Sequence, residues 1–147
     1  MDFSSYLNRT AEIAETETAI LDELADRELL SPIEIRAARS ALQTLIENAI
    51  GKSRRLLKES NCPIVPRSGK DAILFLYETG VLEEELYREL AGAIGFRNAM
   101  IHDYMNFDES VLMELLGSRR YRRIAEYLAW KPELTPVQRH RIENYFL

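Results

Sequence analysis

The stretch from Ser31 to Ser60, SPIEIRAARSALQTLIENAIGKSRRLLKES, decides the fold of this chain. A serine, a proline and then Glu34 form the pattern of a capping box, with proline at the first helical position. Apolar residues then follow one helical face: Ile35, Ala38, Leu42, Leu45, Ala49 and Leu56. This spacing predicts one long helix over 31–60 with an apolar stripe along its length.

The rest of the chain shows the same helical spacing, interrupted by turn signals. Gly80 is a favoured residue just past a helix end, and TPVQ at 135–138 is a second capping box that opens a terminal helix. No strand pattern is present. The predicted helices before the terminal one cover about 2–29, 31–60, 68–79, 83–104 and 108–129. We therefore predict an all-α fold, an antiparallel bundle of four or five helices.

Composition restricts the class of protein. The 147 residues are 46% hydrophobic and 29% charged, as in ordinary soluble domains. No apolar run is long enough to span a bilayer, and the first residues lack a signal-peptide pattern, so we expect a cytoplasmic protein with no membrane partner. The single cysteine, Cys62, cannot form an internal disulfide, and with only two histidines we expect no metal site and no cofactor.

The net charge of −5 argues against indiscriminate binding to nucleic acid. Contacts to RNA or DNA would therefore need a local basic patch, and the sequence offers two. One is the group Lys52, Arg54, Arg55 and Lys58. The other is SRRYRR at 118–123, which places Arg119, Arg120, Arg122 and Arg123 as possible RNA contacts. Each pattern also suits a plain solvated helix face, so both interpretations stay open.

The stretch GFRNAMIHDYMNFD, residues 95–108, carries the candidate chemistry. Asn98 and His102 are four apart on one helical face, so Asn98 can hydrogen-bond His102 and fix its tautomer. Arg97 and His102 are five apart, which separates them by about 140° around an ideal helix. To share a substrate, the arginine must curl, the helix must end or distort near His102, or two chains must combine their copies.

These residue types suit the cleavage of RNA without a metal. A guanidinium grips a phosphate with paired donors, and an imidazole accepts and returns a proton near neutral pH. RNA supplies both a phosphodiester and an adjacent 2′-hydroxyl. A lone histidine on a helix is also commonly structural, so spacing alone decides little. We expect Met100 and Ile101 in the core, and Phe96 and Phe107 there as well.

Beyond spacing, the string GFRNAMIHDY followed by NFDESVL resembles the HepT-like toxins of the HEPN superfamily. The motif of that family is Arg, a polar residue, three further positions, His, any residue, then Tyr. Arg97, Asn98, His102 and Tyr104 match it position by position. The preceding ILFLYETGVLEEELYRELAGAIGFRN and the order of helices also look like the family, over roughly residues 5–128.

The resemblance implies a metal-independent ribonuclease that acts as the toxin of a toxin–antitoxin pair. It implies catalytic roles for Arg97 and His102, a supporting role for Asn98, and a two-fold homodimer in which both motif helices line one cleft. The implied partner is a small MntA-like nucleotidyltransferase, which silences the nuclease by transferring AMP onto Tyr104.

The end of the chain departs from the family pattern, so we expect residues 1–130 to form the HEPN-type bundle and 131–147 a C-terminal helical extension. His140, in this extension, is expected at the surface without a role.

Two rival functions remain at this level. The chain could be a non-catalytic nucleotide-binding or nucleotidyltransferase-partner module, with Tyr104 as a modification site on an inert scaffold. It could also be a helical dimerisation domain without a ligand. This dimerisation hypothesis would be favoured if Arg97 and His102 faced away from each other and from any cleft.

Overall fold

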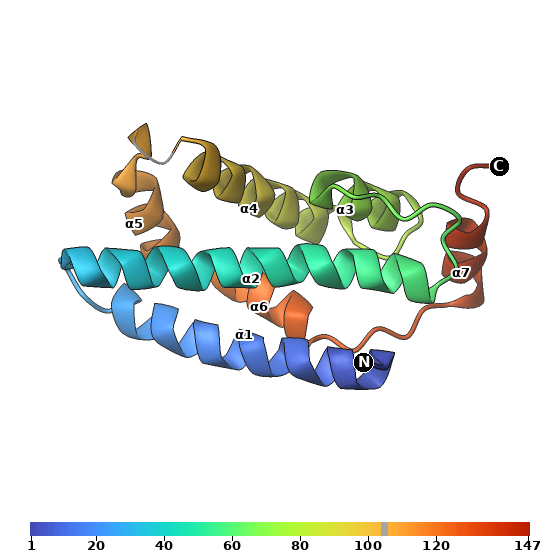
Figure 1. Ribbon diagram of the computed structural model, residues 1–147, viewed down its shortest axis with the longest axis horizontal. Helices are drawn as coiled ribbons and strands as arrows, with labels where there is room; N and C mark the ends of the chain where they lie inside the picture. Colours follow the sequence, from blue (N-terminus) through green and yellow to red (C-terminus); the bar gives the residue numbers. More distant parts are fainter. Residues whose placement is uncertain (104–105) are drawn as a thin grey trace.

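Seven helices make up the part of the chain that the computed structural model describes, residues 1–103 and 106–147 (Figure 1). No described residue belongs to a strand, which confirms the predicted all-α class. The helices are α1 (Phe3–Ala25), α2 (Pro32–Glu59), α3 (Gly69–Glu78), α4 (Glu84–His102), α5 (Glu109–Ser118), α6 (Tyr121–Ala129) and α7 (Pro136–Glu143).

Both predicted capping boxes form. The backbone N–H of Glu34 donates to the Ser31 hydroxyl at 3.2 Å, and the Ser31 N–H donates to the Glu34 carboxylate at 2.8 Å. Thr135 and Gln138 make the same reciprocal pair at 3.1 and 2.9 Å. These bonds satisfy helix N–H groups that have no partner within the helix, and so they set where α2 and α7 begin.

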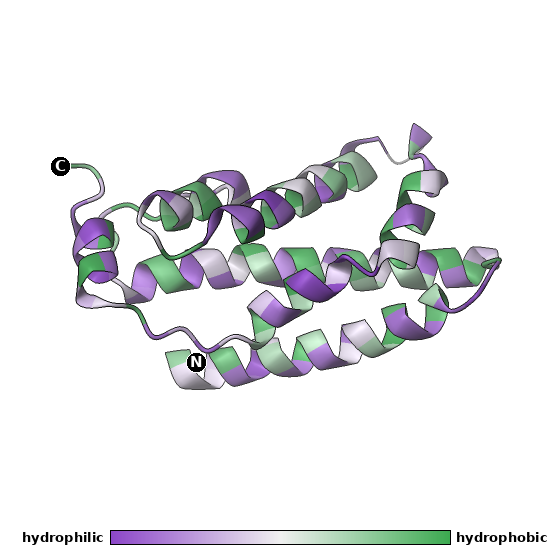
Figure 2. Cartoon of the chain, turned by 180° about the vertical axis from the view of Figure 1, so that it is seen from behind, coloured by the Kyte–Doolittle hydropathy of each residue, from purple (hydrophilic) through white to green (hydrophobic). Residues whose placement is uncertain are grey.

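Helix α2 is the centre of the bundle. Helix α1 runs antiparallel along one side of it, α3 and α4 follow one another along the other side, and α6 lies behind (Figure 1). Apolar and polar bands alternate along the helices, as burial of one face requires (Figure 2). The buried stripe of α2 consists of Ala38, Ala41, Leu42, Leu45, Ile46, Ala49, Leu56 and Leu57.

The prediction of a single helix over 108–129 is wrong. The chain breaks between α5 and α6, where Arg119 adopts a left-handed conformation with φ of 56°. Two residues of low helix propensity, Gly117 and Ser118, precede the break. Asp22 on α1 accepts hydrogen bonds from the Tyr121 hydroxyl at 2.5 Å and from Arg122 Nε at 3.1 Å. These contacts with α1 hold the turned chain in place.

Lys52 is buried inside the bundle and is no candidate for RNA contact. Its side chain is fully enclosed, and its Nζ donates to the carbonyl oxygens of Tyr127 at 2.6 Å, of Leu128 at 3.2 Å and of Trp130. These carbonyls are at the C-terminal end of α6, where the helix dipole favours a cation. Lys52 therefore ties α2 to the end of α6.

The C-terminal segment packs onto α3. Ile142 is fully buried, and the ring of Tyr145 stacks on Phe75 with centroids 3.8 Å apart. Gln138 donates to the carbonyl oxygen of Gly80 at 2.9 Å. His140 is exposed, as predicted. Across the described ranges, no helix is long and apolar enough to cross a membrane.

Candidate functional site

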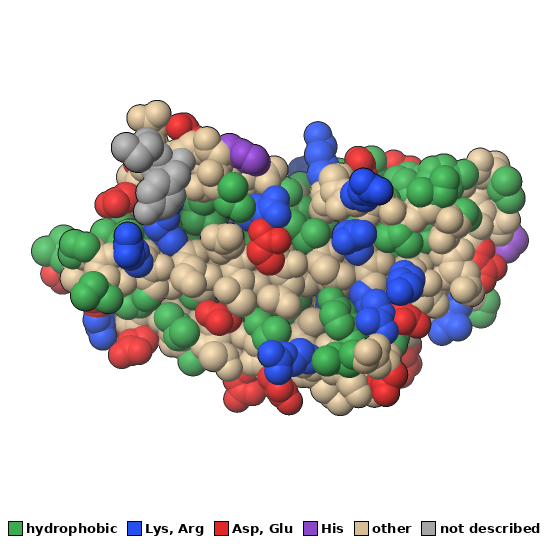
Figure 3. Space-filling view, in the orientation of Figure 1, with side chains coloured by type: hydrophobic (Ala, Val, Ile, Leu, Met, Phe, Trp, Pro, Cys, Tyr) green, Lys and Arg blue, Asp and Glu red, His purple; other side chains and the backbone are tan. Residues whose placement is uncertain are grey.

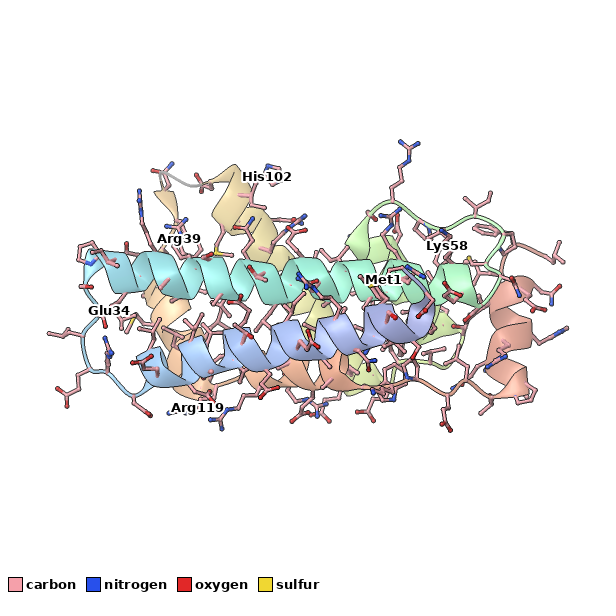
Figure 4. The ribbon with its side chains drawn as sticks, turned by 60° about the horizontal axis from the view of Figure 1, so that its bottom comes forward. Met1, Glu34, Arg39, Lys58, His102 and Arg119 are labelled. Carbon is pink, nitrogen blue, oxygen red and sulfur yellow. The ribbon has the colours of Figure 1, made fainter. Side chains whose placement is uncertain are left out.

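His102 lies at the exposed end of α4 and is therefore not a core histidine. It is the last residue of the helix, and Asp103 closes it by donating its N–H to the Ala99 carbonyl at 3.0 Å. Figure 4 shows His102 on one side of the bundle and Arg119 on the opposite side. An exposed imidazole at a helix end is accessible to a large substrate.

Arg97 is held by two neighbours. Its Nε donates to the Glu47 carboxylate of α2 at 2.5 Å, and its Nη1 donates to Asn98 Oδ1 at 2.8 Å. The side chain of Arg97 is 26% exposed and that of Glu47 is 40% exposed. The two acceptors orient the guanidinium and leave Nη2 for another anion. Glu47 is a residue that sequence reasoning missed, because no local pattern connects it with a position 50 residues away.

The predicted hydrogen bond between Asn98 and His102 is not formed. Asn98 Oδ1 accepts from Arg97 instead, and a charged donor makes the stronger bond. Among the residues that the structure describes, none hydrogen-bonds the His102 side chain.

Within one chain, the structure does not bring the side chains of Arg97 and His102 to the same side of α4. Helix α4 continues through His102, so ideal geometry directs the two side chains about 140° apart. Arg97 faces α2, as its bond to Glu47 shows. Of the three ways to bring both groups to one substrate, the second is met in part, because α4 ends at His102 without distortion before it. A curling arginine and a second chain also remain.

Tyr104 lies outside the described residues. Next to that gap, Phe107 packs edge-on against Phe96 with centroids 5.4 Å apart, and the guanidinium of Arg39 lies 4.7 Å from the Phe107 ring centre. Both phenylalanines pack against the core, as predicted.

The two neighbours Met100 and Ile101 have different outcomes. Met100 is buried at 3% exposure, which confirms its prediction. Ile101 is 44% exposed, so the prediction that it lies in the core is wrong. Consecutive helical residues point about 100° apart, and only one of this pair is turned into the protein interior.

Two hollows border α4, but neither Arg97 nor His102 lines them. One, of about 180 Å³, is mostly apolar and lies between α4 and the α5–α6 pair. The other, of about 460 Å³, is lined mainly by Phe96, Ala99, Asp103, Asn106 and Phe107. Within the described ranges, no group of three or more His, Cys, Asp or Glu residues is placed to hold a metal ion. The candidate site is an open surface.

All four arginines of 119–123 already contact carboxylates. Arg119 pairs with Asp22 and Asp26, and Arg122 pairs with Asp22. Arg120 pairs with Glu89, and Arg123 lies within 3.9 Å of Glu83, Glu85 and Glu126. An RNA phosphate would have to compete with a carboxylate at each arginine. Their role as RNA contacts stays a prediction.

Comparison with known proteins agrees with this architecture. The family model described as "Ribonuclease HepT-like" matches residues 6–129. A solved toxin–antitoxin structure with AMP-PNP contains a chain with a TM-score of 0.73 and 12% identity, covering 87% of this chain and 99% of that one. A tri-AMPylated Shewanella oneidensis HEPN toxin in complex with MNT antitoxin scores 0.74 at 13% identity, covering 87% and 96%. At identities this low, the structural similarity establishes the shared fold alone. Among proteins of curated function, none matches this sequence.

Proposed function

We propose, because the chain belongs to the HepT-like ribonuclease family, that it cleaves RNA as the toxin of a toxin–antitoxin pair. One observation carries the proposal. Arg97 and His102, which match the family motif in the sequence, both lie in the last two turns of α4, with the imidazole exposed and the guanidinium oriented by Glu47.

In the proposed reaction the 2′-hydroxyl attacks the adjacent phosphorus, and the bond from phosphorus to the 5′-oxygen breaks. His102 takes the proton from the 2′-hydroxyl or supplies one to the departing 5′-oxygen. Arg97 stabilises the negative charge that develops on the phosphoryl oxygens. The products are a cyclic 2′,3′-phosphodiester and a free 5′-hydroxyl, so no metal is needed to activate water.

The metal-independent mechanism predicts that RNA cleavage persists in excess EDTA, because protons and charge are handled by side chains alone. The measurement is cleavage of labelled RNA by purified protein with and without the chelator. Loss of cleavage on chelation, restored by a divalent ion, would contradict the mechanism.

We further propose that the active form is a two-fold homodimer. Arg97 and His102 of one chain diverge, whereas two motif helices facing each other can combine an arginine and a histidine in one cleft. The exposed side chain of Ile101, next to His102, supplies apolar surface for such a contact. We expect light scattering to give twice the 17.0 kDa of one chain, and Ile101→Arg to shift the mass towards the monomer. A stable monomer at micromolar concentration would exclude the dimer.

Control of the nuclease is proposed to act through Tyr104. An MntA-like nucleotidyltransferase would let the tyrosyl oxygen attack the α-phosphorus of ATP, with pyrophosphate as the leaving group. The AMPylated toxin–MNT complex with the same fold supports this partner. The adduct adds bulk and a negative phosphodiester two residues from His102, where it competes for Arg97 and repels RNA.

If Tyr104 is the modified residue, co-expression with the transferase should add adenylyl mass to the wild type and none to Tyr104→Phe. Intact-protein mass spectrometry with peptide mapping measures this, and circular dichroism checks that the variant is folded. An adduct on another residue, or neutralisation without any adduct, would leave inhibition to binding alone.

One observation favours the alternative, a non-catalytic nucleotide-binding or nucleotidyltransferase-partner module. The positive charge of Arg97 is already paired with Glu47, so part of its capacity to stabilise a phosphate is used within the chain. Purified protein that cleaves no RNA but binds its transferase tightly would support this alternative.

A further inference from the structure

One of the two basic segments of this acidic chain lies at residues 51–70. Residues 51–70 contain six basic residues and a single acidic one, although the whole chain carries a net charge of −5. Lys and Arg side chains gather over the end of α2 nearest α3 (Figure 3). Four of the six are exposed, and we call them the basic patch: Arg54, Lys58, Arg67 and Lys70.

Local structure brings these four side chains together. Arg54 Nε donates to the carbonyl oxygen of Pro66 at 2.9 Å, which places the following residue, Arg67, beside α2. Lys58 is one turn beyond Arg54 on the same face of α2. Lys70 is in the first turn of α3.

A glycine keeps the start of α3 close to α2. A Cβ atom at Gly69 would lie 2.6 Å from the Ile50 side chain, so a larger residue would force Ile50 or the helices to shift. This close approach holds Lys70 near the exposed face of α2 and completes the basic patch.

The charges of the basic patch are not neutralised within the described parts of the chain. None of its four residues forms an ion pair there, in contrast to every arginine of 119–123. The one acidic residue of the segment, Glu59, pairs with Arg55 at 2.8 Å. Because Pro66 holds Arg54 through Nε, both terminal nitrogens of that guanidinium stay available for an anion.

We propose that the basic patch binds the sugar–phosphate backbone of the RNA substrate beyond the cleavage point. Arg54 and Lys58 follow Glu47 by seven and eleven residues, which places each of them within about 20° of Glu47 on one face of α2. Glu47 holds Arg97, so the basic patch begins about 10 Å along the helix axis from the motif site. An RNA strand bound at Arg97 can therefore continue over the basic patch.

The chemistry favours RNA over an acidic protein surface. Two guanidinium and two ammonium groups match a repeating phosphate, and the motif site at the end of this track is suited to a phosphodiester. The basic patch itself offers no aromatic side chain for base stacking. Binding should therefore be insensitive to base sequence and strongly sensitive to salt. This inference rests on the proposed function.

The test measures RNA binding without cleavage, in a His102→Ala background. Fluorescence anisotropy follows a labelled single-stranded RNA of mixed sequence over a series of salt concentrations. Arg54→Gln combined with Lys58→Gln should weaken binding at least about tenfold at low salt. It should also reduce the slope of log K against log salt by about 1.4, since each lost phosphate contact on a single strand contributes about 0.7.

The matched control is Arg9→Gln combined with Arg139→Gln, which removes two exposed charges on α1 and α7. It should leave affinity and slope unchanged. Equal effects of the two double variants, or no RNA binding at all, would overturn the inference. Weakened transferase binding with unchanged RNA binding would assign the basic patch to protein contact. Wild-type protein that binds RNA through the basic patch without cleaving it would refute the proposed nuclease only.

Discussion

Replacing His102 with Ala is expected to lower the rate of RNA cleavage about 100- to 10,000-fold, the usual contribution of one general acid–base group. The residue is exposed at the end of α4, and no described residue hydrogen-bonds its side chain. Its removal should therefore change the free energy of unfolding by no more than about 0.5 kcal/mol. The assay is single-turnover cleavage of labelled RNA, with urea unfolding measured in parallel.

Three further variants make this experiment specific. His140→Ala removes the only other histidine, which is exposed on α7 outside the motif, and it should cleave at the wild-type rate. Arg97→Lys keeps the charge but loses the bond from Nε to Glu47, so it should retain part of the activity that Arg97→Ala loses. A His102→Ala protein that cleaves as fast as the wild type would refute the assigned role.

The second large effect concerns Lys52. Lys52→Met should reduce the free energy of unfolding by about 3 kcal/mol, because buried carbonyl oxygens lose their donor. Those of Tyr127 and Trp130 would be left without the ammonium, whereas Leu128 keeps a bond of 3.2 Å from the Thr10 hydroxyl. Methionine fills nearly the same volume, so the loss reports hydrogen bonding rather than a cavity.

Lys58→Met is the matched control for this variant. Lys58 is on the same helix and is exposed, so its replacement should shift stability by at most about 0.5 kcal/mol. Urea denaturation followed by circular dichroism compares both with the wild type. Equal midpoints for Lys52→Met and the wild type would show that the carbonyls find other donors.

The pH dependence of stability gives an independent test of the buried state of Lys52. Burial lowers the pKa of Lys52 to about 8, whereas a lysine in the unfolded chain titrates near about 10.4. Between these values the unfolded chain binds more protons, so the contribution of Lys52 to stability rises with pH and is constant below this window. Raising the pH from about 7.5 to 9.5 should therefore stabilise the wild type relative to Lys52→Met.

Local features of the structure follow from the sequence alone. The starts of α2 and α7 come from capping boxes, in which a serine or threonine and a residue three positions later satisfy each other. Gly80 ends α3 with a φ of 83°, a conformation that glycine adopts without strain. The all-α class and the placement of Arg97 and His102 on α4 depend on spacings within one or two helical turns. Such interactions involve residues that are close together in the chain, so the sequence determines them directly.

Tertiary structure alone decided the contacts between distant segments. Asp22 and Tyr121, 99 residues apart, stabilise the turn that separates α5 from α6. Lys52 is buried because the carbonyl oxygens at the end of α6, 75 to 78 residues away, accept hydrogen bonds from its Nζ. Glu47 orients Arg97 across 50 residues. Helical periodicity says which face a side chain occupies but not which distant group meets it, because that depends on how the helices pack.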